Sequence, residues 1–216
     1  PKESAGRQPG YLIGGVPGNF TESCRPVPAE LHNNGGVFVT EGDEYDSAFF
    51  DKRSKFLHYR PTIGVIHNIE FDHADIFDNL AAIERQFHHL LRTVPHSGRV
   101  VVNGLEESLQ RVLGQGCWSE VRSFGAAVSD FSARGEPHDF DVLFQGQVVG
   151  HVAWGLTGVH NQLNALAAML RLSTPTIGSV QLGYPHTACG HVALDVSDFE
   201  ALRSFGGRRS LGQLLA

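Results

Sequence analysis

Several features that would assign a chain to a class at once are scarce in this sequence of 216 residues. Lysine and arginine never form a run longer than a pair such as Arg208-Arg209, and the formal net charge is −6. Binding to a phosphate backbone needs clustered cations, so nucleic acid is not an expected partner. No apolar stretch approaches the roughly 20 residues that span a bilayer, and no signal peptide is recognised, so we expect no membrane insertion.

Cysteine is equally scarce, with three residues far apart in the chain: Cys24, Cys117 and Cys189. An odd number at such spacings does not indicate a disulfide framework, and no Cys-x-x-Cys pair indicates a zinc site. These cysteines fit a reducing compartment, so we expect a cytoplasmic protein. The adjacent pair His88-His89 has no histidine four residues away, which favours solvent exposure over metal binding.

Strand-like and helix-like segments alternate along most of the chain. We expect strands at residues 10–15, 36–41, 62–69, 99–103 and 121–124, and helices at residues 76–94, 106–113 and 158–172. This order predicts an α/β fold with a mainly parallel sheet flanked by helices. Residues 140–144 and 147–154 predict a small antiparallel hairpin with Gly146 at the turn. We expect residues 48–59 to be partly helical, residues 173–191 to be irregular and residues 199–204 to form a short helix.

Acidic loops follow two of the expected strands. Glu41 ends the run at residues 36–41, and the run at residues 62–69 leads into Glu70, Asp72, His73 and Asp75. Ligands of open parallel sheets bind outside the carboxyl ends of the strands. Carboxylates with one imidazole could hold a divalent cation near phosphates there, and Glu41 and His73 would meet if the two strands are neighbours. Simpler interpretations stay open, because a lone loop histidine is usually solvated and Asp75 with Asp78 could cap the following helix.

Three segments in this order resemble the central ATP-binding domain of the Mur ligases, bacterial cytoplasmic enzymes that build peptidoglycan precursors. They are residues 39–46, 68–75 and 158–165, and the resemblance extends from about Gly10 to Arg171. It implies a fold similar to P-loop NTPases and an ATP-dependent ligase. In this family ATP phosphorylates a substrate carboxylate, and an amine then attacks the acyl phosphate.

Residues 49–61 and 81–95 resemble the family member that recycles a murein tripeptide. The implied substrates are UDP-N-acetylmuramate and L-Ala-γ-D-Glu-meso-diaminopimelate. The alternative within the family is the enzyme that adds L-alanine to UDP-N-acetylmuramate, and residues 51–56 favour the recycling enzyme over it. A non-catalytic module that binds nucleotide or metal is the alternative from another class.

The resemblance also implies roles for single residues. Glu41 matches the carboxylate that holds a first Mg²⁺, and His73 matches the ligand of a second Mg²⁺ and a catalytic residue. His160, Asn161 and Asn164 match the motif at the adenine of ATP, and Asn19 lies in the loop that faces the muramoyl substrate. Taken without the resemblance, Asn161 and Asn164 could equally cap a helix or form a surface pair.

One expected motif of the family is not found. The phosphate loop ending in Gly-Lys-Thr should precede Gly10, and residues 14–19 are glycine-rich but lack the lysine and hydroxyl. We therefore expect residues 1–204 to be a central domain lacking its phosphate loop, and residues 205–216 to begin a linker to a C-terminal domain. The isolated chain is expected to be inactive, and the sequence does not indicate an oligomeric state.

Overall fold

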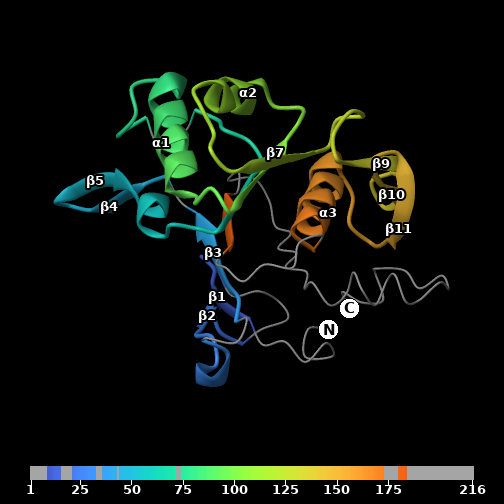
Figure 1. The fold of residues 1–216 in the computed structure, drawn as a ribbon, viewed down its shortest axis with the longest axis horizontal. Coiled ribbons are helices and arrows are strands. Elements are labelled where there is room, and N and C mark those ends of the chain that lie inside the picture. The colour runs from blue at the N-terminus through green and yellow to red at the C-terminus, as the bar shows by residue number, and fades with distance from the viewer. Residues whose placement is uncertain are drawn as a thin grey trace.

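The structure is a computed structural model that describes residues 9–15, 21–32, 36–42, 44–71, 74–172 and 180–183. These residues form a ten-stranded sheet, a separate two-stranded sheet and three α-helices (Figure 1). The strands are β1 (Gly10–Leu12), β2 (Cys24–Arg25), β3 (Phe38–Gly42), β4 (Asp46–Ala48), β5 (Asp51–Ser54), β6 (Ile63–Ile66), β7 (Arg99–Asn103), β8 (Glu120–Phe124), β9 (Phe131–Glu136), β10 (Asp139–Phe144), β11 (Gln147–Ala153) and β12 (Val180–Gly183). The helices are α1 (Leu80–Thr93), α2 (Glu107–Gly114) and α3 (Val159–Leu172), with 3-10 turns η2 (Ala29–Leu31) and η3 (Lys55–His58).

The large sheet is mostly parallel, as the alternation of strands and helices predicts. Its strand order is β11-β10-β9-β8-β7-β6-β12-β3-β1-β2. Six neighbouring pairs are parallel, from β1–β3 across the sheet to a single bridge between β8 and β9. The three antiparallel pairs lie at the two ends of the sheet, where hairpins replace helical crossovers. In the part of the chain that the structure describes, no helix has both the length and the apolar character needed to cross a membrane.

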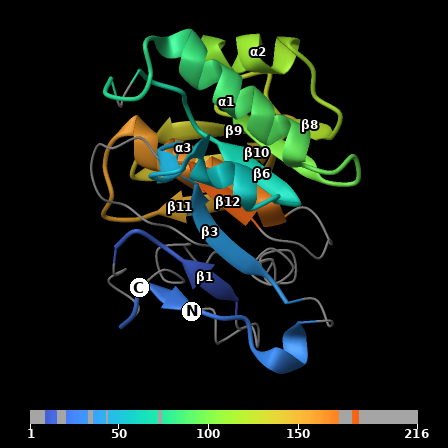
Figure 2. The ribbon, with the colours of Figure 1, turned by 90° about the vertical axis from the view of Figure 1, so that its left-hand side faces the viewer.

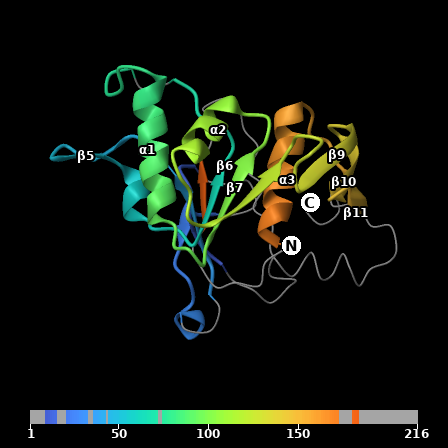
Figure 3. The ribbon, with the colours of Figure 1, turned by 45° about the horizontal axis from the view of Figure 1, so that its top comes forward.

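Helices cover both faces of the central strands. Figure 3 shows α1 and α2 on one side of β6 and β7, and α3 on the other. Along β7 the side chains alternate: Val100 and Val102 join the core under α1 and α2, whereas Val101 joins the core under α3. Because helices bury both faces, these strands are apolar at nearly every position. This explains the continuous apolar runs in the sequence.

Helix α1 begins later than its sequence suggests. Its apolar face buries Ile83, Phe87, Leu90 and Leu91, so the predicted helical spacing is correct. Asn79 is the N-cap, and its side chain accepts a hydrogen bond from the amide of Ala82 at 3.0 Å. The predicted start at residue 76 and the capping roles considered for Asp75 and Asp78 are therefore wrong.

The region after α3 differs from the expected irregular segment. Residues 180–183 form β12, which pairs in parallel with β3 on one side and with β6 on the other. Four residues are too short a run to show a strand period, and hydrogen bonds from both neighbours stabilise the segment instead. The rest of residues 173–191 and the helix expected at residues 199–204 lie outside the described residues.

Two local predictions are confirmed. The expected hairpin is β10–β11, and its turn has positive φ at Gln145 (48°) and Gly146 (81°), as a two-residue hairpin turn requires. Residues 48–59 are partly helical, as expected: β4 and β5 form a small hairpin that leads into η3. This hairpin extends beyond α1 at the edge of the molecule (Figure 1).

Candidate active site at the carboxyl edge of the sheet

The acidic loops follow strands that end at the same edge of the sheet but are not neighbours. Glu41 of β3 lies level with Leu182 of β12, which lies level with Val65 of β6. The condition that β3 and β6 be adjacent is therefore not met, and two strand spacings, roughly 10 Å, separate them. All three strands are parallel, so β3 and β6 still end at one edge. His73 itself lies outside the described residues, as does Asn19.

A direct contact nevertheless joins the two loops across β12. The hydroxyl of Tyr45, three residues after β3, donates a hydrogen bond to Oδ2 of Asp75 at 2.7 Å. Asp75 follows His73 by two residues, so this bond connects the backbone around Glu41 to the loop that carries His73. Tyr45 is thus a candidate site residue that reasoning from the sequence missed, although it lies in the acidic segment at residues 39–46.

The carboxylate of Glu41 has a backbone partner from a third loop. The amide of Gly14, just after β1, donates to Oε2 of Glu41 at 2.7 Å. β1 lies beside β3 (Figure 2) and pairs with it in parallel. Leu12 pairs with Thr40, so Gly14 lies at the same edge of the sheet. Three loops therefore converge at the carboxyl ends of β1, β3 and β6.

A magnesium ion fits this donor set in chemical type. Mg²⁺ prefers oxygen, and it is commonly bound through one or two carboxylates together with water and substrate phosphates. Among the described residues, no three His, Cys, Asp or Glu side chains gather as a complete metal cage. Glu41 would therefore supply one carboxylate to a site completed by phosphate and water, rather than form a metal cage of protein ligands.

The start of α3 offers a second set of polar groups. Asn161 is 5% exposed, and its Nδ2 donates to the carbonyl of Thr157 at 2.7 Å. Its Oδ1 is buried and has no hydrogen-bond partner among the described residues. An unsatisfied buried acceptor costs about 1–3 kcal/mol, so a donor such as the amino group of adenine suits this position. His160 is exposed and Asn164 is half-buried, and the structure shows no bond between these two and Asn161.

The capping interpretation of Asn161 is therefore only partly right. The side-chain nitrogen of Asn161 does bond to the loop before the helix, but the side-chain oxygen has no hydrogen-bond partner among the described residues. Helix α3 approaches the carboxyl end of β8: a Cβ built on Gly125 would lie 2.8 Å from Cδ2 of Leu163 and 2.9 Å from Oδ1 of Asn103. The Asn161 group thus belongs to the same edge of the sheet as Glu41, several strands away.

His67 lies between these two groups, at the end of β6. Its ring packs against Phe124, with 5.0 Å between the ring centroids. Burial disfavours the charged imidazole and lowers the pKa of His67 to about 4. The side chain is therefore neutral at physiological pH. The sequence places His67 in an expected strand but does not reveal this burial, because the ring packs against Phe124 of β8, which is distant in sequence.

Residues 26–172 match the family described as the Mur ligase middle domain. The chain belongs to this family. The matched range covers β3 to α3 and contains every site residue named above except Gly14 and Asn19. Family membership and the mostly parallel α/β fold were both predicted from the sequence, and both are confirmed.

Individual relatives of this Mur ligase domain include two kinds of enzyme. It is 46% identical over 169 residues to the UDP-N-acetylmuramate–L-alanyl-γ-D-glutamyl-meso-2,6-diaminoheptandioate ligase of Haemophilus influenzae, covering 77% of the chain and 36% of that protein. It is 30% identical over 142 residues to the UDP-N-acetylmuramate–L-alanine ligase of Clostridium botulinum strain Hall, covering 63% and 31%. The chain thus spans about a third of the length of these curated relatives.

Solved structures give the same picture. The UDP-N-acetylmuramate:L-alanyl-γ-D-glutamyl-meso-diaminopimelate ligase from Neisseria meningitides is 49% identical with a TM-score of 0.72, over 81% of this chain and 56% of that one. The murein peptide ligase of Psychrobacter arcticus 273-4 is 34% identical with a TM-score of 0.63, over 81% and 40%. The roles of Glu41, His73, His160, Asn161, Asn164 and Asn19, and the domain limits at residues 204 and 205, stay predictions.

Proposed function

We propose that this Mur ligase domain is the central part of an ATP-dependent ligase that joins murein tripeptide to UDP-N-acetylmuramate. The observation that carries the proposal is the difference in identity: 46% and 45% to two ligases named for the tripeptide, against 30% and 28% to two ligases named for L-alanine. We place the activity in the whole protein, in the cytoplasm, with ATP and Mg²⁺ as cofactors.

The chemistry of the reaction explains why few side chains are needed. Transfer of a phosphoryl group to a carboxylate depends on positioning and on neutralisation of charge, which bound Mg²⁺ supplies. In this proposal Glu41 and His73 would hold the two metal ions. The Gly14 amide orients Glu41, and Tyr45 holds Asp75, two residues after His73 in the sequence. Asn19 contacts UDP-N-acetylmuramate.

The nucleotide base is assigned to the start of α3. Oδ1 of Asn161 accepts a hydrogen bond from the amino group of adenine, and His160 and Asn164 complete the contact. A base that presents a carbonyl oxygen at this position would leave the buried acceptor unsatisfied. This arrangement predicts a preference for ATP over GTP.

The substrate assignment is tested with the full-length protein, ATP and UDP-N-acetylmuramate, offering either the tripeptide or L-alanine. We expect the tripeptide adduct as the dominant product by mass spectrometry, with release of ADP and phosphate. Preferential use of L-alanine would establish the sister activity instead. Nucleotide binding without either product would leave only a non-catalytic binding module.

The residue assignments are tested by substitution. His73→Ala should lower kcat far more than it weakens ATP binding, since a ligand near the transferred phosphoryl acts mainly in the transition state. Asn161→Leu should raise the KM for ATP about tenfold, which corresponds to roughly one hydrogen bond. Gln162→Leu is the control, because the Gln162 side chain donates instead to the carbonyl of Gly135. An unchanged KM in Asn161→Leu would contradict the adenine contact.

A further inference from the structure

The contact between Gly14 and Glu41 does more than connect two strands. At 2.7 Å it is a short bond from a backbone amide to a carboxylate, and bonds to an ionised acceptor are stronger than neutral ones. Among the described residues it is the only hydrogen bond to the Glu41 side chain that the structure shows. It occupies Oε2 and leaves Oε1 without a protein partner there.

A side chain at residue 14 would make the Glu41 carboxylate shift from its present position. A Cβ built on Gly14 would lie 2.9 Å from Oε2, 3.7 Å from Cδ and 3.9 Å from Oε1 of Glu41. The same atom built on Gly15 meets nothing within 4 Å. Neither glycine has a positive φ, so the requirement at residue 14 is for space and not for an unusual backbone conformation.

We propose that Gly14 is a positioning residue for a divalent-cation site at Glu41. Its amide holds Oε2, and its missing side chain lets the carboxylate stay where Oε1 is the oxygen left to coordinate the ion. The inference rests on the proposed function, which assigns Glu41 to magnesium. Mg²⁺ demands near-ideal octahedral geometry, so a carboxylate fixed before the ion arrives binds it better than a mobile one.

A purely structural role for the bond gives a different expectation. In that case the Gly14 amide would only join the end of β1 to β3. A methyl group at residue 14 would then change the thermal stability and leave cation affinity as it was. Partners that orient a metal ligand typically change metal affinity by about 10–100-fold when they are altered.

The test measures cation binding directly, without turnover. Binding of Mn²⁺ to the full-length protein is followed by the electron paramagnetic resonance of the free ion, with a non-hydrolysable ATP analogue at the same concentration in every sample, because phosphate completes the site. We compare the original protein with Gly14→Ala, Gly15→Ala and Glu41→Gln. Both glycines are exposed, so neither substitution disturbs core packing, and thermal unfolding reports any difference in stability.

We expect Gly14→Ala to weaken Mn²⁺ binding about tenfold or more, Gly15→Ala to leave it unchanged, and Glu41→Gln to remove the site. If Glu41→Gln matters and the two alanine variants are equal, the inference is wrong and the metal role of Glu41 stands. If Glu41→Gln has no effect, or the original protein binds no Mn²⁺, the assignment of Glu41 to magnesium fails as well.

A second measurement needs no substitution. Titration of the ¹⁵N-labelled protein with Mg²⁺ should shift the amide resonance of Gly14 more than that of Gly15, because only the Gly14 amide shares the coordinating carboxylate. Saturable Mg²⁺ binding that leaves the Gly14 resonance in place would overturn the proposal.

Discussion

The parallel and antiparallel halves of the large sheet differ in how their strands are buried. In the parallel half, β6 and β7 lie between helices, and all positions of β6 and four of five in β7 are buried. In the antiparallel half, the described residues place a helix on one face of β9, β10 and β11. Phe140, Val142 and Val152 are buried in the core under α3, whereas Asp139, Asp141 and His151 carry charged groups on the outer face. One sheet thus contains continuous apolar runs and alternating ones.

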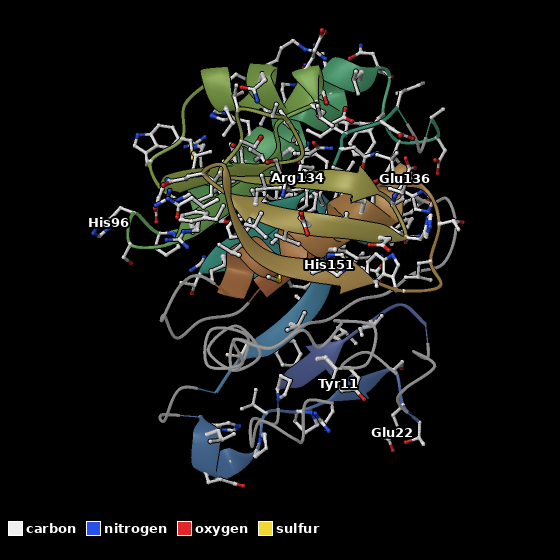
Figure 4. All side chains as sticks on the ribbon, turned by 90° about the vertical axis from the view of Figure 1, so that its right-hand side faces the viewer. Tyr11, Glu22, His96, Arg134, Glu136 and His151 are labelled. Atoms are coloured by element: carbon white, nitrogen blue, oxygen red, sulfur yellow. The ribbon has the colours of Figure 1, made fainter. Side chains whose placement is uncertain are left out.

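The outer face of the antiparallel half carries a network of charges (Figure 4). Arg134 Nη2 lies 2.7 Å from Asp141 Oδ2, and His151 bridges Asp141 and Asp139 at 3.1 Å each. The guanidinium of Arg134, with a smaller contribution from His151, lowers the pKa of Asp141. Such exposed ion pairs add little to the stability of the protein. The candidate site lies at the carboxyl edge of the parallel strands and at the start of α3.

The largest effect is expected where the antiparallel half touches the core. Phe140→Ala should lower the free energy of unfolding by about 3–5 kcal/mol, because this ring is 1% exposed and packs edge-on against Trp154. Val148→Ala, in the neighbouring strand at 52% exposure, should cost less than about 0.5 kcal/mol. Urea denaturation followed by circular dichroism measures both. Equal losses would mean that the two faces of this half do not differ as described.

His67, in the parallel half of the sheet, makes the stability of the protein depend on pH. The folded pKa of His67, about 4, is below the ordinary value of 6.5, so the unfolded chain takes up the proton first on acidification. The contribution of His67 to the free energy of unfolding is therefore fully present above pH 6.5. It is lost as the pH drops towards 4, and the loss is up to about 3 kcal/mol. Denaturation curves at pH 7 and pH 5 should show the loss, and His67→Asn should flatten it. An identical pH dependence in the variant would place the titration elsewhere.

Helix α1 covers the parallel half of the sheet, and its N-cap should contribute to the stability of the protein. Asn79→Ala removes the cap of α1 and should cost about 1 kcal/mol in the free energy of unfolding. Asp78→Ala is the matched control and should change it by no more than a few tenths, since Asp78 is exposed and makes no cap bond. If Asp78→Ala cost as much as Asn79→Ala, the helix would begin earlier than Leu80.

The smallest effect is expected on the charged outer face. Asp141→Asn breaks the charge pairs with Arg134 and His151 but keeps the shape of the side chain. We expect only a slight change in stability at neutral pH, because solvent screens these exposed groups. Thermal unfolding at low and high salt measures the change. A loss of stability as large as that of Asn79→Ala would show that this face is buried against another part of the protein.

Much of this architecture was predictable from the sequence. The limits of β7, the β10–β11 hairpin and the apolar face of α1 were predicted correctly, because each depends on the spacing of nearby residues. Family membership also followed from local segments, which keep their order and chemistry whatever surrounds them. The roles of His73 and Asn19 rest on the sequence alone, since both lie outside the described residues.

Only the tertiary structure decided which of these segments meet. β12 enters between β3 and β6 from far along the chain, so the strands of Glu41 and His73 are not neighbours. The bonds from Gly14 to Glu41 and from Tyr45 to Asp75 join residues 27 and 30 positions apart. Burial lowers the pKa of His67, and its ring packs against Phe124 of another strand. Local patterns determine where strands and helices form, but strand order and long-range contacts determine the site, because burial and hydrogen bonding there depend on neighbours that are distant in sequence.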